Sequence, residues 1–160
     1  MDPLEAMREQ SGLRLDAEGR FWHRGGLVEH ARTLGVLHQG LHRAENGRWA
    51  TRIGKEWGYV EVDDAALFVR RIEPDGARLR AQLASGAWVP VEPGSLIAGA
   101  GDVLYARTGG ERARLTRAAQ LSLADLLREE SGAFFLELAG VRHSIGRDAG
   151  PEPVRRQTHD

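Results

Sequence analysis

The fold is predicted first from residues 103–117, VLYARTGGERARLTR, and from the residues that follow them. Gly109-Gly110 separates two short runs of alternating residues, a Leu- and Ala-rich segment follows, and residues 133–145, AFFLELAGVRHSI, supply a second pair of runs. Alternation of apolar and polar residues indicates strands, whereas apolar residues three and four apart indicate a helix. The stretch therefore predicts a hairpin, a helix that begins at Thr116 and ends near Glu130, and a second hairpin.

The first sixty residues repeat this order of parts. Residues 13–24 have the pattern of a hairpin with its turn at Gly19, and residues 27–41 carry an amphipathic helical stripe. The strands that follow flank a turn at Gly47. Gly35 falls inside the expected helix, either because another segment approaches closely or as a tolerated weak position. We predict an α+β protein built from two related ββαββ-like units with antiparallel sheets.

The segments around these units complete the expected organisation. The middle of the chain is all strand and turn, and Pro90 within it indicates an edge strand. The composition of the C-terminal residues, rich in Pro and Gly without an apolar pattern, predicts disorder. The predicted parts are a short N-terminal helix (1–12), a first unit (13–66), a strand-rich connector (67–98), a second unit (99–146) and a disordered tail (147–160).

Composition excludes several classes of function. The chain has 160 residues, a net charge of -1 and no cysteine. A nearly neutral chain has no overall field that attracts nucleic acid or a membrane surface, so neither is an expected partner. No apolar run approaches the ~20 residues of a membrane helix, and the first residues lack the apolar core of a signal peptide. We expect a cytoplasmic protein without disulfides or thiolate chemistry.

Three arginines are the candidate anion ligands. Arg112 and Arg114 would share one face of a strand, and Arg117 would lie in the first turn of the following helix. Guanidinium groups placed in this way can bind a phosphate or a carboxylate with two hydrogen bonds. The competing interpretation is a solvated strand face whose arginines pair with Glu111 and other acids.

The tryptophans suggest a planar ligand. Trp49 and Trp57 flank a glycine-containing step between two expected strands, where they could line a groove. A stacked base together with the arginines would hold a nucleotide. The competing role is packing, and we expect at least two of Trp22, Trp49, Trp57 and Trp88 to lie in the core.

Histidines give a weaker signal. His30, His38 and His42 recur at helical spacings, but no carboxylate or cysteine stands at a ligand spacing from them. A solvated helix end is the simpler interpretation, and no metal or cofactor is predicted. His143 alternates with apolar neighbours, as a hydrogen-bonded core histidine does.

Paired acids leave a catalytic alternative open. Asp63 and Asp64 follow an expected strand, where carboxylates could act as acid, base or Mg²⁺ ligands. Acids at a strand end also commonly cap a turn. No serine lies in a nucleophile elbow, and no glycine run matches a phosphate-binding loop.

Several motifs of the chain resemble the sequence pattern of the bacterial domain-of-unknown-function family 1285 (DUF1285). The matching motifs are Leu13-x-Leu-Asp-x-x-Gly-x-Phe-Trp-x-x-Gly25, Val60-Glu-Val-Asp-Asp-Ala65, and Ala113-Arg-Leu-Thr-Arg117 followed by Leu123 and Leu126. The resemblance spans residues 13–146. It implies a duplicated core, a pleckstrin-homology-like second half, and a ligand site between the halves for a nucleotide-like molecule with a signalling role. No activity is established for the family.

The chain departs from the family pattern at several positions. Arg52-Ile-Gly-Lys-Glu56 stands where the family has Thr-Pro-x-Glu, the usual proline near Ala66 is missing, and so are aromatic residues near Gln120 and Leu121. These differences indicate a distant relative. The difference near Glu56 prevents the transfer of individual binding residues from the family.

The sequence supports one leading hypothesis and two alternatives. The leading hypothesis is a non-enzymatic ligand-binding or signalling module that holds a small anionic, nucleotide-like ligand between its halves. Its site residues are Arg112, Arg114, Arg117, Trp49 and Trp57. One alternative is a metal-dependent hydrolase that uses Asp63, Asp64 and a histidine. The other is an interaction scaffold or homodimer, because Leu121 points away from the apolar face of its helix.

Overall fold

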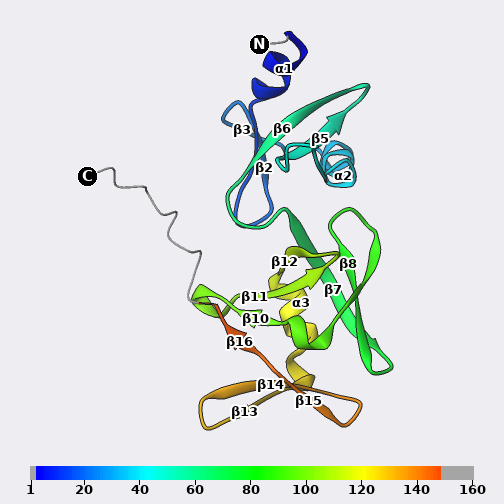
Figure 1. Cartoon of the computed structure of the whole chain (residues 1–160), viewed down its shortest axis with the longest axis vertical. Coiled ribbons are helices and arrows are strands. Elements are labelled where there is room, and N and C mark those ends of the chain that lie inside the picture. Colours follow the sequence, from blue (N-terminus) through cyan, green and yellow to red (C-terminus); the bar gives the residue numbers. More distant parts are fainter. Residues whose placement is uncertain (1–2, 149–160) are drawn as a thin grey trace, which may run out of the picture. The chain divides into compact units, whose positions relative to one another are not determined.

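The computed structural model describes residues 3–148, and its contacts divide the chain into two compact units (Figure 1). Unit 1 contains the residues up to Phe68 together with residues 82–87. Unit 2 contains Val69–Ala81 and the residues from Trp88 onward. Strands dominate both units, and a few short helices accompany them, so the predicted α+β class is confirmed.

Unit 1 is built on a six-stranded sheet with the order β3-β2-β1-β6-β5-β4. Adjacent strands pair antiparallel except β1 and β6, which run parallel with Leu13 opposite Val60. A parallel pair needs a long crossover, and the chain between these strands, which includes a helix, supplies it. The strands are β1 (Leu13–Leu15), β2 (Phe21–His23), β3 (Gly26–Leu27), β4 (His42–Arg43), β5 (Trp49–Ile53) and β6 (Glu56–Val62).

Helix α2 (Ala31–Gln39) packs beside this sheet and closes the core of unit 1. Its buried Leu37 joins Leu13, Leu15 and Phe21 in one apolar cluster. Thr51 of β5 is fully buried, and its hydroxyl donates to the Leu37 carbonyl at 2.7 Å. The sheet therefore turns one face to the helix. Because strand side chains alternate, the residues between these core positions lie on the opposite face.

The helix is shorter than the sequence predicted. Residues 27–41 were expected to be helical, but Leu27 pairs in β3 and His30 caps the helix by accepting from the Thr33 amide. Gly35 has no atom within 4 Å of the position that a Cβ would take, so it is a tolerated weak position and not a close approach. A second helix, α1 (Pro3–Glu9), lies where a short N-terminal helix was expected and contacts β6.

Unit 2 is built on a seven-stranded sheet with the order β16-β10-β11-β12-β7-β8-β9. The segment expected as a connector supplies four of these strands, and β9 with Pro90 lies at the sheet edge, as predicted. The strands are β7 (Leu67–Asp75), β8 (Arg78–Leu83), β9 (Trp88–Val91), β10 (Ile97–Ala98), β11 (Leu104–Thr108), β12 (Glu111–Leu115) and β16 (Gly146–Arg147). Short 3₁₀ turns, η1 (Pro93–Ser95) and η2 (Ala100–Asp102), precede and follow β10.

The predicted long helix of unit 2 is wrong in its second half. Helix α3 (Arg117–Ser122) is capped by Thr116, whose hydroxyl accepts from the Ala119 amide at 3.3 Å, and a 3₁₀ turn, η3 (Ala124–Leu126), follows. The next residues form β13 (Leu127–Glu130) in a three-stranded sheet with β14 (Ala133–Leu138) and β15 (Val141–Ser144). Pairing with β14 overrides the helix propensity of the sequence LREE.

The order hairpin, helix, hairpin recurs in both units, but the strand pairing differs. In unit 1 the hairpins join one sheet through β1 and β6, whereas in unit 2 the second hairpin belongs to a separate sheet. Residues 149–160, most of the tail predicted to be disordered, lie outside the described residues.

Candidate functional site

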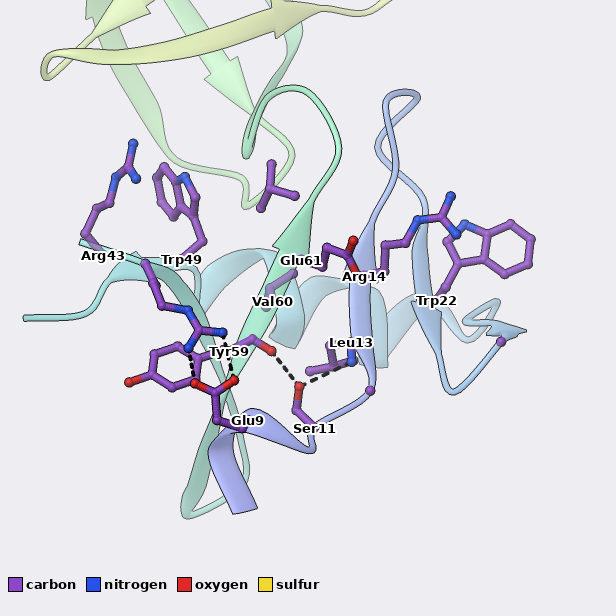
Figure 2. A pocket seen from close by; sticks show the side chains of 14 residues that line it. Glu9, Ser11, Leu13, Arg14, Trp22, Arg43, Trp49, Tyr59, Val60 and Glu61 are labelled. Atoms are coloured by element: carbon purple, nitrogen blue, oxygen red, sulfur yellow. Dashed lines mark hydrogen bonds and ion pairs between the residues drawn. The ribbon is translucent and has the colours of Figure 1, made fainter. Parts of the chain in front are cut away.

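A polar and aromatic pocket of about 720 Å³ lies on unit 1 (Figure 2). This volume falls within the range of typical small-molecule sites. The lining comes from the end of α1 and the segment that joins it to β1, from strands β1, β2, β4, β5 and β6, and from the turns before β3 and β5. Its charged and aromatic members are Glu9, Arg14, Arg43, Arg48, Glu61, Trp22, Trp49 and Tyr59.

Three of these side chains form a row across adjacent strands. Arg14 of β1 stands opposite Trp22 of β2 and opposite Glu61 of β6. Their neighbours Leu13, Phe21 and Val60 are buried in the core, so the row lies on the sheet face opposite α2. Figure 2 shows Arg14 and Trp22 extending to the same side, with Glu61 next to Arg14. The row thus presents a cation, an indole and a carboxylate together.

Arg14 is held in place by Asp63. Its Nε donates to both carboxylate oxygens of Asp63, at 3.2 and 3.0 Å. Its Cζ lies 6.0 Å from the Trp22 ring centroid, within the range of a cation–π contact. Asp63, considered as a catalytic acid from the sequence, therefore orients an arginine of the pocket. Asp64 has a polar interaction of its own.

A buried carboxylate fixes Trp22. Asp16 is 3% exposed and accepts from the Trp22 indole Nε1 at 2.9 Å and from the Arg20 Nε at 2.8 Å. It also accepts from the amides of Glu18 and Arg20, at 3.0 and 2.9 Å, which closes the turn before β2. Gly19 has φ +86°, which suits glycine in that turn. In the Leu-x-Leu-Asp-x-x-Gly-x-Phe-Trp motif, the Asp and Gly thus shape the turn and orient this tryptophan, whereas the Leu and Phe residues pack in the core.

The environment of Asp16 also sets its ionisation. Burial alone would raise its pKa, but the hydrogen bonds from Trp22 and Arg20 and the charge of Arg20 together outweigh burial, so the pKa lies below its ordinary value. Asp16 is therefore a charged acceptor at neutral pH.

Arg43 and Trp49 form another wall of the pocket. They stand opposite each other on β4 and β5, and the Arg43 Cζ lies 4.4 Å from the Trp49 ring centroid. The Arg43 Nη1 donates to the Gly47 carbonyl at 2.8 Å, within the turn that Gly47 closes with φ +83°. Figure 2 shows the guanidinium and the indole extending side by side. The turn recognised in the sequence therefore positions this pair.

Tyr59, Arg48 and Glu9 complete the lining. The Arg48 Cζ lies 3.7 Å from the Tyr59 ring centroid, and its guanidinium pairs with the Glu9 carboxylate. The Tyr59 hydroxyl donates to Glu5 at 2.7 Å, and this bond, with burial, raises the pKa of Tyr59 above its ordinary value. The phenol is therefore neutral at physiological pH. Ser11 ties the segment after α1 to β6 by donating to the Tyr59 carbonyl at 2.5 Å.

Trp57 lines a second, adjacent pocket of about 600 Å³ on unit 1. The Arg8 Cζ lies 3.8 Å from a Trp57 ring centroid, and the His42 ring meets the indole edge to face at 6.2 Å. Arg43 and Tyr59 line both pockets. Trp49 and Trp57, predicted to share one groove, thus occupy two pockets with a common wall.

The expectation that at least two tryptophans are core residues is wrong. Trp22, Trp49 and Trp57 are half-buried, and Trp88 is 41% exposed. Trp49 comes nearest to the expectation because it packs against the core cluster of unit 1. An arginine stacks on Trp88 as well, with the Arg80 Cζ 4.4 Å from the ring centroid.

The three predicted anion-binding arginines belong to unit 2. Arg112 and Arg114 flank buried Ala113 on β12 and share a strand face. Arg112 stacks on Tyr105, with its Cζ 3.7 Å from the ring centroid, and pairs with Asp148 at 3.5 Å. Arg117 is the first residue of α3 and lines a cavity in unit 2. That these three arginines bind an anion stays a prediction.

The histidines have local roles. His30 caps α2, His38 meets the Phe21 ring edge to face at 4.8 Å, and the His42 Nδ1 donates to the Gly40 carbonyl at 2.7 Å. His143 of β15 is half-buried opposite Leu136. Within residues 3–148, no three His, Asp or Glu side chains gather closely enough to hold a metal ion.

Most residues of the unit 1 pocket were not predicted from the sequence. Arg14, Arg43, Arg48, Tyr59 and Glu61 come from distant segments that only strand pairing assembles. One signal was available: in residues 13–15 and 21–23 the polar and aromatic residues alternate with core residues, which places Arg14 and Trp22 on one face.

Two solved structures share this fold. A DUF1285 family protein from Silicibacter pomeroyi DSS-3 aligns with a TM-score of 0.64 and 19% identity, over 86% of this chain and 81% of that one. A DUF1285 family protein from Shewanella baltica OS155 aligns with a TM-score of 0.55 and 18% identity, over 72% of this chain and 91% of that one. The resemblance to DUF1285 is thereby confirmed at the level of the fold.

Comparisons by sequence add no further relative, since neither a known family nor a curated protein matches the chain. Among the described residues, no helix has the length and apolarity required to traverse a lipid bilayer.

Proposed function

We propose that this protein is a non-enzymatic ligand-binding module with a signalling role, and that the pocket on unit 1 binds a small, planar, anionic ligand. A nucleoside monophosphate has the required chemistry. The observation that carries the proposal is the convergence of three arginines with Trp22, Trp49 and Tyr59 on one pocket of suitable volume.

The charges of the lining favour an anion. Three arginines and two glutamates line the pocket, so guanidinium groups outnumber carboxylates in the lining, while Asp63 outside the lining pairs with Arg14. Guanidinium groups bind phosphate through paired hydrogen bonds, and Arg43 and Arg48 flank the same turn at Gly47. Arg43 is the proposed phosphate ligand, and Arg48, whose two terminal nitrogens pair with Glu9, adds its charge beside it.

The aromatic residues favour a planar group beside that anion. Trp22 is held rigidly by Asp16, and Trp49 is backed by the core of unit 1, so stacking on either costs little side-chain entropy. The Glu61 side chain makes no hydrogen bond or ion pair with residues 3–148. Its carboxylate is suited to accept from a hydroxyl or amino group of the ligand.

Calorimetric titration of the full chain with AMP and GMP, and with adenosine and inorganic phosphate as partial ligands, tests the proposal. Arg43→Ala should weaken nucleotide binding at least tenfold, because it removes a charged hydrogen-bond donor. The matched control is Arg80→Ala, which removes an arginine stacked at the same 4.4 Å distance on Trp88, outside the pocket. Equal affinities of the two variants would refute the assignment, as would the absence of nucleotide binding by the unmodified chain.

A further inference from the structure

A second cavity, of about 380 Å³, lies within unit 2 and differs in character from the first. Its lining is mainly apolar: Leu121 comes from α3, Leu127 from β13 and Phe134 from β14, with Ile145 following β15. Leu121 is 65% exposed and Phe134 is 36% exposed, although both are large apolar side chains. Filling a concave, exposed apolar surface with an apolar molecule lowers the free energy, because apolar area is removed from water.

The polar groups at this cavity are engaged, with one exception. Asp102 pairs with Arg147 at 3.7 Å. The Gln120 Oε1 accepts from the Leu104 amide at 2.9 Å, and its Nε2 donates to the Asp102 carbonyl at 3.2 Å. Arg117 also lines the cavity, and its exposed guanidinium has no ion-pair or hydrogen-bond partner within residues 3–148. The cavity therefore combines an apolar interior with one arginine that forms no ion pair among the described residues, beside the Asp102–Arg147 pair.

We propose that this cavity binds a small amphiphilic carboxylate, such as a medium-chain fatty acid, with its hydrocarbon chain among Leu121, Leu127 and Phe134 and its carboxylate on Arg117. The apolar lining requires a hydrocarbon body, and the charge of Arg117 requires an anionic head. The volume lies near the lower end of small-molecule sites, which favours a single acyl chain over a lipid with two. The site is independent of the nucleotide pocket proposed on unit 1.

The test is calorimetric titration of the full chain with decanoate, kept below its micellar concentration, and with decanol as the uncharged analogue. Decanoate should bind with one site per chain and more tightly than decanol. Arg117→Gln should weaken decanoate about tenfold and leave decanol unchanged, because only the charged hydrogen bonds are lost. Arg70→Gln, an exposed arginine of the same unit outside this cavity, should change neither affinity.

Leu121→Asp provides the test of the apolar part. Leu121 is largely exposed, so the variant should keep the melting temperature of the unmodified protein while losing both decanoate and decanol binding. Equal decanoate affinities of Arg117→Gln and the unmodified chain would overturn the proposal. So would sedimentation that shows a dimer which Leu121→Asp dissociates and decanoate does not, because a second copy would then cover the cavity.

Discussion

Replacement of Asp16 by alanine should have two effects: it should destabilise unit 1, and it should disturb the proposed nucleotide pocket. Asp16 is 3% exposed and accepts four hydrogen bonds, two from backbone amides, one from the Trp22 indole and one from the Arg20 side chain. Alanine leaves those donors without the carboxylate and frees Trp22 to rotate. The same substitution therefore changes both the folding free energy and the position of an aromatic wall.

The expected cost is about 2–4 kcal/mol of unfolding free energy, because a hydrogen bond to a charged acceptor contributes roughly 1.5–3 kcal/mol and water replaces part of the loss. The Arg20 ion pair adds little, since its side chain is 56% exposed and exposed pairs contribute at most about 1 kcal/mol. The indole and the two turn amides therefore account for most of the effect.

Urea denaturation at neutral pH measures this change, with the exposed Asp125→Asn as the control that should stay within about 0.5 kcal/mol of the unmodified chain. An Asp16→Ala midpoint equal to that of the control would refute the role given to Asp16. Asp16→Ala should also weaken AMP binding, whereas Asp125→Asn should not.

The ionisation of Asp16 adds a pH dependence with a defined sign. Its pKa in the folded protein lies below the ordinary value, so its contribution is complete above the pKa of the unfolded chain, about 3.9. The contribution is lost as the pH falls through the lower pKa of the folded state. The stability difference between the unmodified chain and Asp16→Asn should therefore be constant from pH 7 to about 5 and shrink below about pH 4.

Further predictions concern the packing of unit 1. Thr51→Val should lower stability by about 1–2 kcal/mol in thermal denaturation, because the Leu37 carbonyl loses a fully buried donor, and Thr51→Ser should recover much of the loss. Gly58→Ala should cost about 1–3 kcal/mol, because its Cβ would lie 2.6 Å from the Ser11 Cβ, and Ser11 is fixed by its bond to Tyr59. Gly35→Ala, where nothing lies within 4 Å, should instead raise stability by about 0.5–1 kcal/mol. Equal effects of Gly58→Ala and Gly35→Ala on stability would show that the contact with Ser11 does not limit position 58.

Local signals in the sequence predicted the local structure well. The Asp-x-x-Gly turn after β1 and the Asn-Gly turn before β5 set their own geometry through short-range hydrogen bonds. Pro90 predicted an edge strand because proline has no backbone N–H to donate to a neighbouring strand. These features depend on residues close in the chain, so a sequence contains the information directly.

Features that depend on distant partners were not predictable in the same way. The LREE segment has helical propensity, and only its pairing with β14 makes it a strand. The parallel pairing of β1 with β6 brings Arg14 beside Glu61, which is 47 residues away by number and shares no motif with it. The arginines of the unit 1 pocket were therefore overlooked, whereas the visible cluster at residues 112–117 drew the prediction to unit 2.

Binding of AMP in the unit 1 pocket can be followed through the indole N–H signals of the four tryptophans in a proton–nitrogen correlation spectrum recorded during titration. The signals of Trp22 and Trp49 should shift together and saturate at one ligand per chain, while the signal of Trp88, outside the pocket, should stay in place. A titration that moves Trp88 and leaves Trp22 and Trp49 unchanged, or moves none of the four, would contradict binding in this pocket.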